Sequence, residues 1–339
     1  MAVIFAKSAG LADDFWGAEA EFIRATMLDV DSEKTKDDTL LESLFNVEKS
    51  DRFGEKSAGM TAFGDFTPVE EGGEAPLDDF QQTYPKLIEH EQLMKQFRCT
   101  ASAYEDMATK GVNKVDKLQA KNFVRAYHRS RAKFATAALC GEGATFAFGG
   151  KSYDRTTGDG KALFATNHTN KKNNATQSNV FTNAFGTDDV MLNRLANVGR
   201  NLTNDTGEIM GYTYDTIVIP GNCPRLEALV RKICASDQQV GSNYNDINVN
   251  KGLWKMIVNP YWQAADGAEP YIIMSSELNK EGQGNMFFDR IPLTVRDQID
   301  IGTHDLIWSG RARFSAGFWN WRHVIMGGAK TGTTLEVAL

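Results

Sequence analysis

The stretch YEDMATKGVNKVDKLQAKNFVRAYHRSRAKFATAAL, residues 104–139, carries the clearest structural signal in this chain of 339 residues. It contains no proline, Gly111 is its only early helix breaker, and it is rich in alanine, lysine and arginine, which are strong helix formers. We therefore predict one long helix that ends at Gly141 and Gly143, since glycine commonly stops helices. At 1.5 Å per residue this helix would be about 50 Å long.

Apolar and basic side chains separate onto opposite sides of this predicted helix, at about 100° per residue. The apolar side consists of Val112, Phe123, Tyr127, Phe134 and Ala138, with Val115 at its edge. The opposite side is basic and consists of Lys110, Lys114, Lys117, Lys121, Arg125 and His128. Such a row of cations either faces solvent or lies against a polyphosphate without reading its bases. The sequence leaves both interpretations open.

The C-terminal part of the chain has the two-residue period of a β-strand. One face of residues 306–318 is apolar and consists of Leu306, Trp308, Ala312, Phe314, Ala316 and Phe318. The other face carries Arg311, Arg313 and Ser315. Because a long strand pair and a long helix each need cover for an apolar face, we expect the two to lie along each other.

The first 50 residues form a segment apart. Phe22, Ile23 and Met27 give residues 11–30 a loose helical pattern, and a second short amphipathic piece follows at 40–47. Between them DSEKTKDD, residues 31–38, is a polar run that we interpret as a flexible joint. The segment is either an arm that gains order by lying on another surface or an N-terminal helical hairpin.

Residues 51–100 predict a projecting hairpin. Two strand-like arms flank PVEEGGEAP, residues 68–76, in which prolines and glycines mark an exposed turn. The tip is acidic, with Glu70, Glu71, Glu74, Asp78 and Asp79. A hairpin with so little apolar surface is not stable alone, so it needs a partner in its own chain or in a neighbouring subunit.

The middle of the chain reads as a compact mixed α/β unit. Residues 144–187 are rich in glycine, asparagine, threonine and lysine, which favours long connections, with a short strand near 162–166. Asp188 and Pro224 are each placed to open a helix. Short strands are expected at 216–219, 254–258 and 271–274.

Composition narrows the functional classes. The formal charge of −7 argues against a simple nucleic-acid-coating protein, and the four cysteines have neither CxxC spacing nor a histidine at a zinc-like interval. They read as reduced, mostly buried thiols. The N-terminus lacks the apolar region of a signal peptide, and no run approaches the roughly 20 apolar residues that span a bilayer. We therefore expect a cytosol-like compartment and no membrane partner.

No motif for catalysis, cofactors or metals is complete. Residues 149–152, GGKS, supply the end of a phosphate-binding loop, but Thr145 occupies the first glycine position. Residues 90–94, HEQLM, begin like a zinc-protease HExxH, yet Met94 stands where the second histidine must be. We predict no catalytic residue, no metal and no cofactor. Three histidines are interpreted as structural or exposed: His168, His304 and His323.

Three stretches now suggest a family. GDGKALFATNHTNKKNNATQSN at 158–179, YDTIVIPGNCPRLEALVRKI at 214–233, and WKMIVNPYW at 254–262 with the ending WSGRARFSAGFWNWRHVIMGG stand in the order found in major capsid proteins of tailed bacteriophages. In the first stretch Leu163, Phe164, His168, Ser178 and Asn179 match, while Ala162 replaces the usual proline. The chain resembles this family, of the Hong Kong 97 fold type, including the branch of the Mu-like major head subunit.

The resemblance implies an α+β capsid fold with four regions. These are an N-terminal arm (1–50), an extended loop (51–100), a peripheral domain with the long spine helix (101–148 and 290–335) and an axial domain (149–289). It also implies hexamers and pentamers that enclose double-stranded DNA in a virion, assembled in the host bacterial cytoplasm, with scaffold, portal and decoration proteins as partners.

Particular residues acquire roles by the same resemblance. The spine helix faces the lumen in this family, which would place Lys110, Lys114, Lys117, Lys121 and Arg125 near packaged DNA. The acidic loop would suit a basic patch on the adjacent subunit. Two other functions stay open: an encapsulin-like nanocompartment shell, which shares the fold but packs protein cargo, and a cytosolic enzyme with an unrecognised site.

Overall fold

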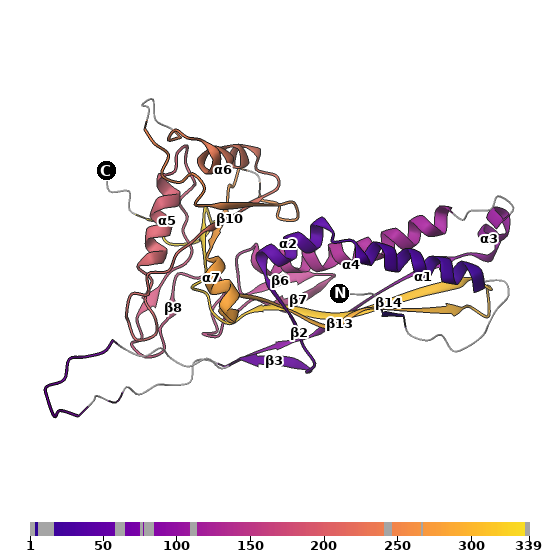
Figure 1. Cartoon of the computed structure of the whole chain (residues 1–339), viewed down its shortest axis with the longest axis horizontal. Coiled ribbons are helices and arrows are strands. Elements are labelled where there is room, and N and C mark those ends of the chain that lie inside the picture. Colours follow the sequence, from indigo (N-terminus) through magenta and orange to yellow (C-terminus); the bar gives the residue numbers. More distant parts are fainter. Residues whose placement is uncertain are drawn as a thin grey trace.

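The computed structural model describes residues 4–5, 17–57, 65–74, 77, 85–108, 114–240, 246–265 and 267–335. It has two parts (Figure 1): an elongated part, in which helices lie on strands, and a compact α/β part at one end of it. A thin loop extends below the compact part and past it. The chain is therefore of the mixed α+β class that the sequence predicts.

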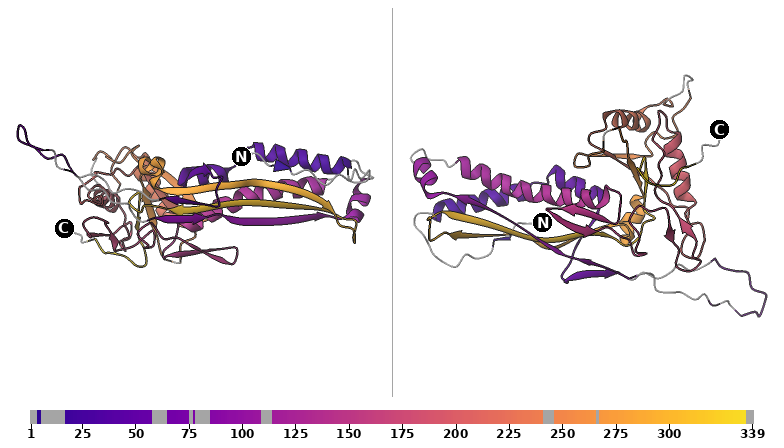
Figure 2. Two further views of the ribbon diagram at one scale, coloured as in Figure 1. Left: turned by 90° about the horizontal axis from the view of Figure 1, so that it is seen from below. Right: turned by 180° about the vertical axis from the view of Figure 1, so that it is seen from behind.

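The elongated part is a helix packed on a sheet. α4 (Lys114–Leu139) lies on strands in the order β1-β13-β14-β5, with β2 also paired to β13. The strands are β1 (Ile4–Phe5), β2 (Asn46–Lys49), β5 (Glu91–Cys99), β13 (Asn285–Ile299) and β14 (Leu306–Phe318). The antiparallel pair β13–β14 runs along α4 (Figure 2), which confirms the expected strand pair beside the long helix.

The prediction of a single helix over residues 104–139 is wrong at its N-terminal end. A separate helix, α3 (Ala101–Ala108), precedes α4, and Gly111 lies outside the described residues. α4 has 26 residues, so its length is about 39 Å rather than about 50 Å. A glycine costs a helix interior about 1 kcal/mol relative to alanine, which favours separate helices on its two sides.

The absence of a side chain at Gly310 lets α4 lie close to the sheet. A Cβ added to Gly310 of β14 would come within 2.5 Å of the Phe123 ring of α4, far inside van der Waals contact. The Phe123 ring also packs beside Phe97 of β5, at 5.1 Å between centroids, and Phe97 stacks on Trp308. These rings form the core beneath the N-terminal half of α4.

Residues 17–44 of the N-terminal segment form two consecutive helices that both pack along α4. α1 (Gly17–Ser32) buries Ile23 and Met27, and α2 (Lys36–Leu44) buries Leu41 and Leu44. The segment thus gains order by lying on another surface, as the arm interpretation required, but that surface belongs to its own chain.

The expected flexible joint at residues 31–38 is wrong. Thr35 caps α2: its side chain accepts a hydrogen bond from the Asp38 amide, and the Asp38 carboxylate accepts one from the Thr35 amide. This reciprocal capping box satisfies backbone donors that a helix start otherwise leaves unpaired. The same polar residues that suggested a joint therefore fix the start of a helix.

Residues 51–100 divide between the projecting hairpin and the main sheet. β3 (Gly54–Ser57) pairs with β4 (Lys86–Glu89) at the base of the hairpin, and residues 65–74 project past the compact part (Figure 1). β5, by contrast, is an edge strand of the main sheet, so the hairpin ends before residue 91. Much of the two strand-like arms expected on either side of residues 68–76 lies outside the described residues.

The compact part is built on a second sheet with the order β11-β10-β12-β15. Its elements are α5 (Val190–Arg200), β10 (Thr216–Pro220), α6 (Pro224–Ala235), β11 (Lys255–Asn259), β12 (Tyr271–Met274) and β15 (Val324–Gly327). The two helices and the strands predicted at 216–219, 254–258 and 271–274 are confirmed. The N-cap of α5 is Asp189 rather than Asp188. β15 was not predicted as part of this unit, and it returns the C-terminal region to the compact part.

Short elements complete the fold. They are β6 (Thr145–Phe148), β7 (Lys151–Asp154), β8 (His168–Thr169), β9 (Thr176–Gln177), α7 (Ser276–Leu278) and the π-helical turn η1 (Asn279–Gln283). The strand expected near 162–166 is absent from the described residues. The Asn179 side chain accepts a hydrogen bond from the Ala165 amide at 3.0 Å and donates one to the Leu163 carbonyl at 2.8 Å, and so takes the place of a strand partner.

Replacing Gly310 with valine tests the close contact between α4 and the sheet. The added methyl groups would overlap the Phe123 ring, so we expect Gly310→Val to lower the free energy of unfolding by about 1–3 kcal/mol. Gly302→Ala is the matched control, because its Cβ would meet only an Asp300 oxygen at 3.6 Å. Urea denaturation of the unassembled chain measures both, and an equal effect of the two substitutions would contradict the prediction.

Candidate functional site

Five buried charged side chains join α1, α2, α4 and β13. His128 of α4 has Nδ1 2.9 Å from Asp38 Oδ1 and Nε2 3.2 Å from Asp31 Oδ1. Arg131, one turn further, contacts Asp38 at 3.3 Å and pairs with Asp289 of β13 through its other terminal nitrogen. We call these five residues the ion cluster. All of their side chains are at most 14% exposed.

The cluster shifts the pKa values of its members in opposite directions. Burial alone would lower the pKa of His128, but its contacts with Asp31 and Asp38 raise that pKa to about 9. Burial would raise the pKa of Asp38, but hydrogen bonds from His128 and Thr35 hold it at about 2. Burial prevails at Asp289 and raises its pKa to about 6, although Arg131 opposes the shift.

His128 lies on the basic side of α4, as helical periodicity predicts, but it faces neither solvent nor a polyphosphate. The N-terminal helices cover this part of α4 and present Asp31 and Asp38 to the ring. Asp31 and Asp38 were unremarkable as members of a polar run, and sequence spacing gives no sign that they meet a residue 90 or more positions away.

A cavity of about 350 Å³ opens beside the ion cluster. Charges of both signs line it, including Lys34, Glu42, Glu48 and Lys49. Among the described residues, no group of three or more histidine, cysteine or acidic side chains is arranged to hold a metal ion. The cluster's evident role is to fasten α1 and α2 to the helix and sheet beneath them.

The raised pKa of His128 predicts a specific loss of stability at alkaline pH. The folded chain holds the His128 proton more tightly than the unfolded chain, so this stabilisation is complete below about pH 6.5 and is lost as pH rises through about 9. We expect it to be worth about 3 kcal/mol. His128→Gln removes it, so the stability difference between wild type and variant should shrink between pH 6.5 and 9.5.

Urea denaturation at several pH values measures the difference in free energy of unfolding between wild type and His128→Gln. The contributions of other titrating groups cancel when the two are compared. Asp38 titrates in the folded chain near pH 2 and Asp289 near pH 6, below this window. A stability difference that stays constant from pH 6.5 to 9.5 would show that His128 carries no extra proton in the fold.

The remaining basic residues of α4 are accessible where they are described. Lys117 and Arg125 are exposed and Lys121 is half-exposed. The Lys117 ammonium lies 5.3 Å from the centre of the Phe22 ring of α1. Lys110 lies outside the described residues, and Lys114 begins α4. Because these side chains are accessible, the basic row can either face solvent or lie against a polyphosphate.

The acidic residues of the projecting loop are exposed as far as they are described. Glu70, Glu71 and Glu74 lie at the tip, where the Gly73 amide donates a hydrogen bond to the Glu70 carbonyl at 2.8 Å. Asp78 and Asp79 lie outside the described residues. Among the described side chains of this loop, none of the three glutamates forms an ion pair within the chain.

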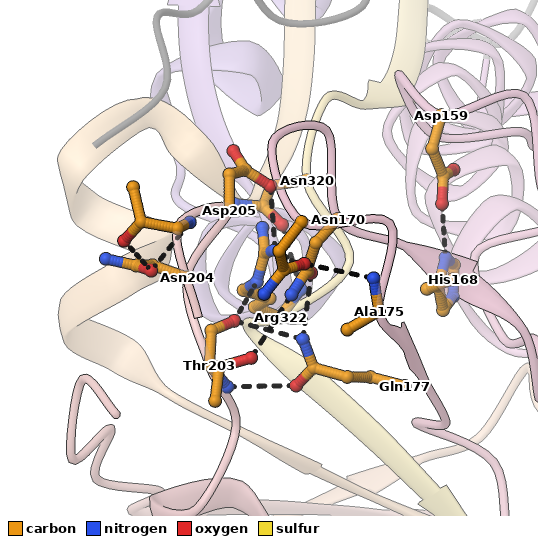
Figure 3. Close-up of polar contacts among 12 residues, drawn as sticks. Asp159, His168, Asn170, Ala175, Gln177, Thr203, Asn204, Asp205, Asn320 and Arg322 are labelled. Carbon is orange, nitrogen blue, oxygen red and sulfur yellow. Dashed lines mark hydrogen bonds and ion pairs between the residues drawn. The ribbon is translucent and has the colours of Figure 1, made fainter. Parts of the chain in front are cut away.

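The segment 158–179 is anchored by buried polar contacts. His168 is fully buried, accepts or donates a hydrogen bond at 2.8 Å with Asp159, and stacks on Trp321 at 4.3 Å. Arg322 donates to Asn170 and pairs with Asp205 at 3.0 Å (Figure 3). The interpretation of His168 as structural is confirmed. These contacts tie the loops of the compact part to the chain just before β15.

The incomplete catalytic motifs have structural roles. Lys151 and Ser152 lie in β7, a strand, whereas a phosphate-binding loop requires a helix to follow. The His90 ring lies between Ser50 and Ser315, 2.9 Å from each hydroxyl. His323 is buried and its pKa falls to about 3, so it stays neutral, and His304 is exposed.

Two further sequence predictions concern the cysteines and the membrane. Cys99, Cys140, Cys223 and Cys234 are all free thiols, of which Cys99 and Cys223 are buried, as expected. In the described part of the chain, every helix is too short or too polar to cross a bilayer.

Comparison by sequence finds no relative: no family model matches the chain, and no curated protein does. Comparison by structure does find similar chains. A chain of Mycobacterium phage Patience has a TM-score of 0.54 at 12% identity, over 99% of this chain and 93% of that one. A chain of the capsid of an empty GTA particle has a TM-score of 0.52 at 11% identity, over 89% of this chain and 92% of that one. A chain of Mycobacterium phage Cain has a TM-score of 0.51 at 11% identity, over 88% of this chain and 91% of that one.

These likenesses extend over almost the whole length of each chain, at an identity too low for sequence comparison to detect. They show that the chain has the Hong Kong 97-type capsid fold.

Proposed function

We propose that this chain is the major capsid subunit of a tailed bacteriophage, a structural protein that assembles with copies of itself into an icosahedral shell around double-stranded DNA. The observation that carries the proposal is a fold shared, over 88–99% of the chain, with chains of phage and GTA particles. The subunit acts in the virion, is assembled in the host bacterial cytoplasm, and catalyses no reaction.

The shape of the chain supports this proposal. Its accessible surface is 18426 Å² for a mass of 37.5 kDa, whereas a compact monomer of that mass exposes roughly 13,800 Å². The excess comes with a helix-on-sheet part that is only two layers thick and a loop that stands away from it (Figures 1 and 2). Surface of this kind is covered when copies pack side by side in a shell.

The regions of the chain take the roles that the family resemblance implies. Residues 1–50 form the N-terminal arm, and the hairpin that ends before residue 91 forms the extended loop. The elongated part, with β5, α4, β13 and β14, is the peripheral domain, and the compact part, with β15, is the axial domain. The resemblance of segment 158–179 supports a place in the Mu-like branch. Hexamers and pentamers are the assembly units, and scaffold, portal and decoration proteins are the partners.

The exposed cations of α4 contact the packaged DNA in this proposal. Lys117, Lys121 and Arg125 lie along one accessible side of the helix, and Lys110 and Lys114 extend the row in sequence. Contacts of this type are made to phosphates, so they suit a genome of any sequence.

Electron microscopy of the expressed chain tests the proposed function. We expect closed shells of uniform diameter whose extracted contents are nucleic acid. Shells that contain an enzyme and no nucleic acid would instead support an encapsulin-like nanocompartment. A chain that stays monomeric in every condition, with or without a scaffold protein, would contradict the proposal and reopen the possibility of an enzyme.

Charge reversal on α4 tests the DNA contact separately. We expect Lys117→Glu, Lys121→Glu and Arg125→Glu together to leave shells intact but to weaken DNA binding, and to lower the slope of log affinity against log salt by about 3. The control variant reverses three exposed charges of the compact part, Arg200, Arg231 and Lys232. Fluorescence anisotropy with a short duplex measures both, and an equal effect would remove α4 from the proposed DNA surface.

A further inference from the structure

The base of the projecting hairpin is held against the rest of the chain by one face of β4. Lys86, Ile88 and His90 are every second residue, so their side chains lie on the same side of the chain. All three side chains are largely buried, whereas Leu87 and Glu89 between them are exposed. The base lies beside the junction of the elongated and compact parts (Figure 1).

Lys86 is anchored to the segment that follows β7. Its ammonium lies 3.0 Å from an Asp154 carboxylate oxygen and donates hydrogen bonds to the Thr156 carbonyl and, at 3.3 Å, to the Thr156 hydroxyl. Asp154 in turn accepts hydrogen bonds from the Thr156 amide and hydroxyl at 3.0 and 2.9 Å. Arg155, the residue between them, donates to the Glu142 carbonyl just past α4 at 3.0 Å. Lys86 therefore pairs with a segment that is already fixed to the end of α4.

Ile88 and His90 are anchored to β14. The Ile88 side chain lies directly on Gly317, where an added Cβ would come within 2.5 Å of it. The His90 ring spans the Ser50 and Ser315 hydroxyls at 2.9 Å from each. Burial lowers the pKa of His90, so the neutral ring donates through one nitrogen and accepts through the other. Each of the two contacts admits the strand at one position only.

Three anchors on two different elements fix a direction as well as a position. Ile88 and His90 hold the base to β14, and contacts with a single strand would leave the base free to pivot about that strand. Lys86 removes the pivot, because its partners lie on the segment through which the chain passes from β7 to the compact part.

The length of the hairpin makes this direction matter. The 14 residues from Ser57 to Glu71 can span at most about 50 Å. A tilt of about 10° at the base would then move the tip by up to about 9 Å, which is farther than a hydrogen bond or an ion pair can reach. Copies with different tilts would present their tips to other subunits at different places.

We propose that Lys86, Ile88 and His90 are positioning residues that hold the base of the hairpin in one direction, and that this fixed direction makes the assembled shells uniform in diameter. This inference rests on the proposed shell function. A shell closes with one curvature only if every copy offers its contacts at the same angle. The three anchors set that angle within each subunit, before any two subunits meet.

A distance measurement in the unassembled chain tests the first half of the proposal. Spin labels at Lys56→Cys of β3 and Arg200→Cys of α5 give one distance by pulsed electron paramagnetic resonance. We expect a single narrow distribution, which Lys86→Met makes at least twofold wider because the third anchor is lost. Glu89→Gln is the matched control on the exposed side of the same strand. A chain without the introduced cysteines corrects for labelling of the native thiols.

Gly317→Ala releases the base by an independent route. The added methyl group would overlap Ile88 and push β4 outward, although all three anchoring side chains remain in the sequence. We expect the same widening of the distribution as with Lys86→Met. Circular dichroism of each unassembled variant verifies that it is folded.

A double substitution separates loss of the anchor from a general loss of structure. Lys86→Met and Asp154→Asn both remove the same contact, so the two together should widen the distribution no more than Lys86→Met alone. Effects that add would show that the two residues act separately, and would overturn the role of Lys86 as an anchor on Asp154.

The diameter of the shells tests the second half of the proposal. In electron micrographs, shells of the unmodified chain and of Glu89→Gln should have one diameter. Lys86→Met and Gly317→Ala should give shells whose diameters vary at least threefold more, because their hairpins start in several directions.

The outcomes separate this inference from the function on which it rests. An unchanged distance distribution in Lys86→Met overturns the positioning role. A wider distribution together with shells of one diameter overturns the link between that role and shell size. Unmodified chains that never form shells overturn the proposed function, whereas the distance measurement on the unassembled chain still decides whether the three residues hold the base.

Discussion

The packing of α4 against β13 and β14 is the interaction on which the rest of the structure depends. Gly310 permits it by leaving room for the Phe123 ring. α1 and α2 then pack on α4, and the ion cluster fastens them to both layers through Asp38 and Asp289. A part that is one helix and one sheet thick cannot bury both of its faces. Charge therefore remains on the accessible side of α4 and on the side of the sheet that faces away from α4, where Arg296 and Arg311 are exposed.

Much of this arrangement could be predicted from periodicity. The long helix, the strand pair beside it and the strands of the compact part all show as apolar spacing, because each element buries one face in its own chain. The start of α4 could not be predicted, because a glycine such as Gly111 destabilises a helix but does not fix the residue at which the helix begins or ends. The join at residues 31–38 was misread because a capping box and a flexible joint use the same polar residues, and only the structure shows Asp31 and Asp38 buried.

The candidate surfaces were harder to predict than the fold. The acidic loop and the basic row on α4 are local in sequence and could be found by counting charges. His128, which the sequence places in that row, belongs to the ion cluster instead. The basic side of the sheet that faces away from α4 could not be found in this way. Its exposed arginines, Arg296 and Arg311, come from different strands, and only the register of β13 and β14 brings them together. The alternation in residues 306–318 predicts which side chains of β14 lie on that side of the sheet, but it does not predict which side chains of β13 lie beside them.

Charge is distributed unevenly along the chain. Acid is concentrated on the loop that leaves one end, and base lies on the two faces of the elongated part. Mass photometry of freshly purified chains at rising concentration tests the claim of self-assembly most directly. Shell formation predicts a discrete species in the megadalton range that appears cooperatively above a threshold concentration. A single species at 37.5 kDa, unchanged at every concentration, would contradict it.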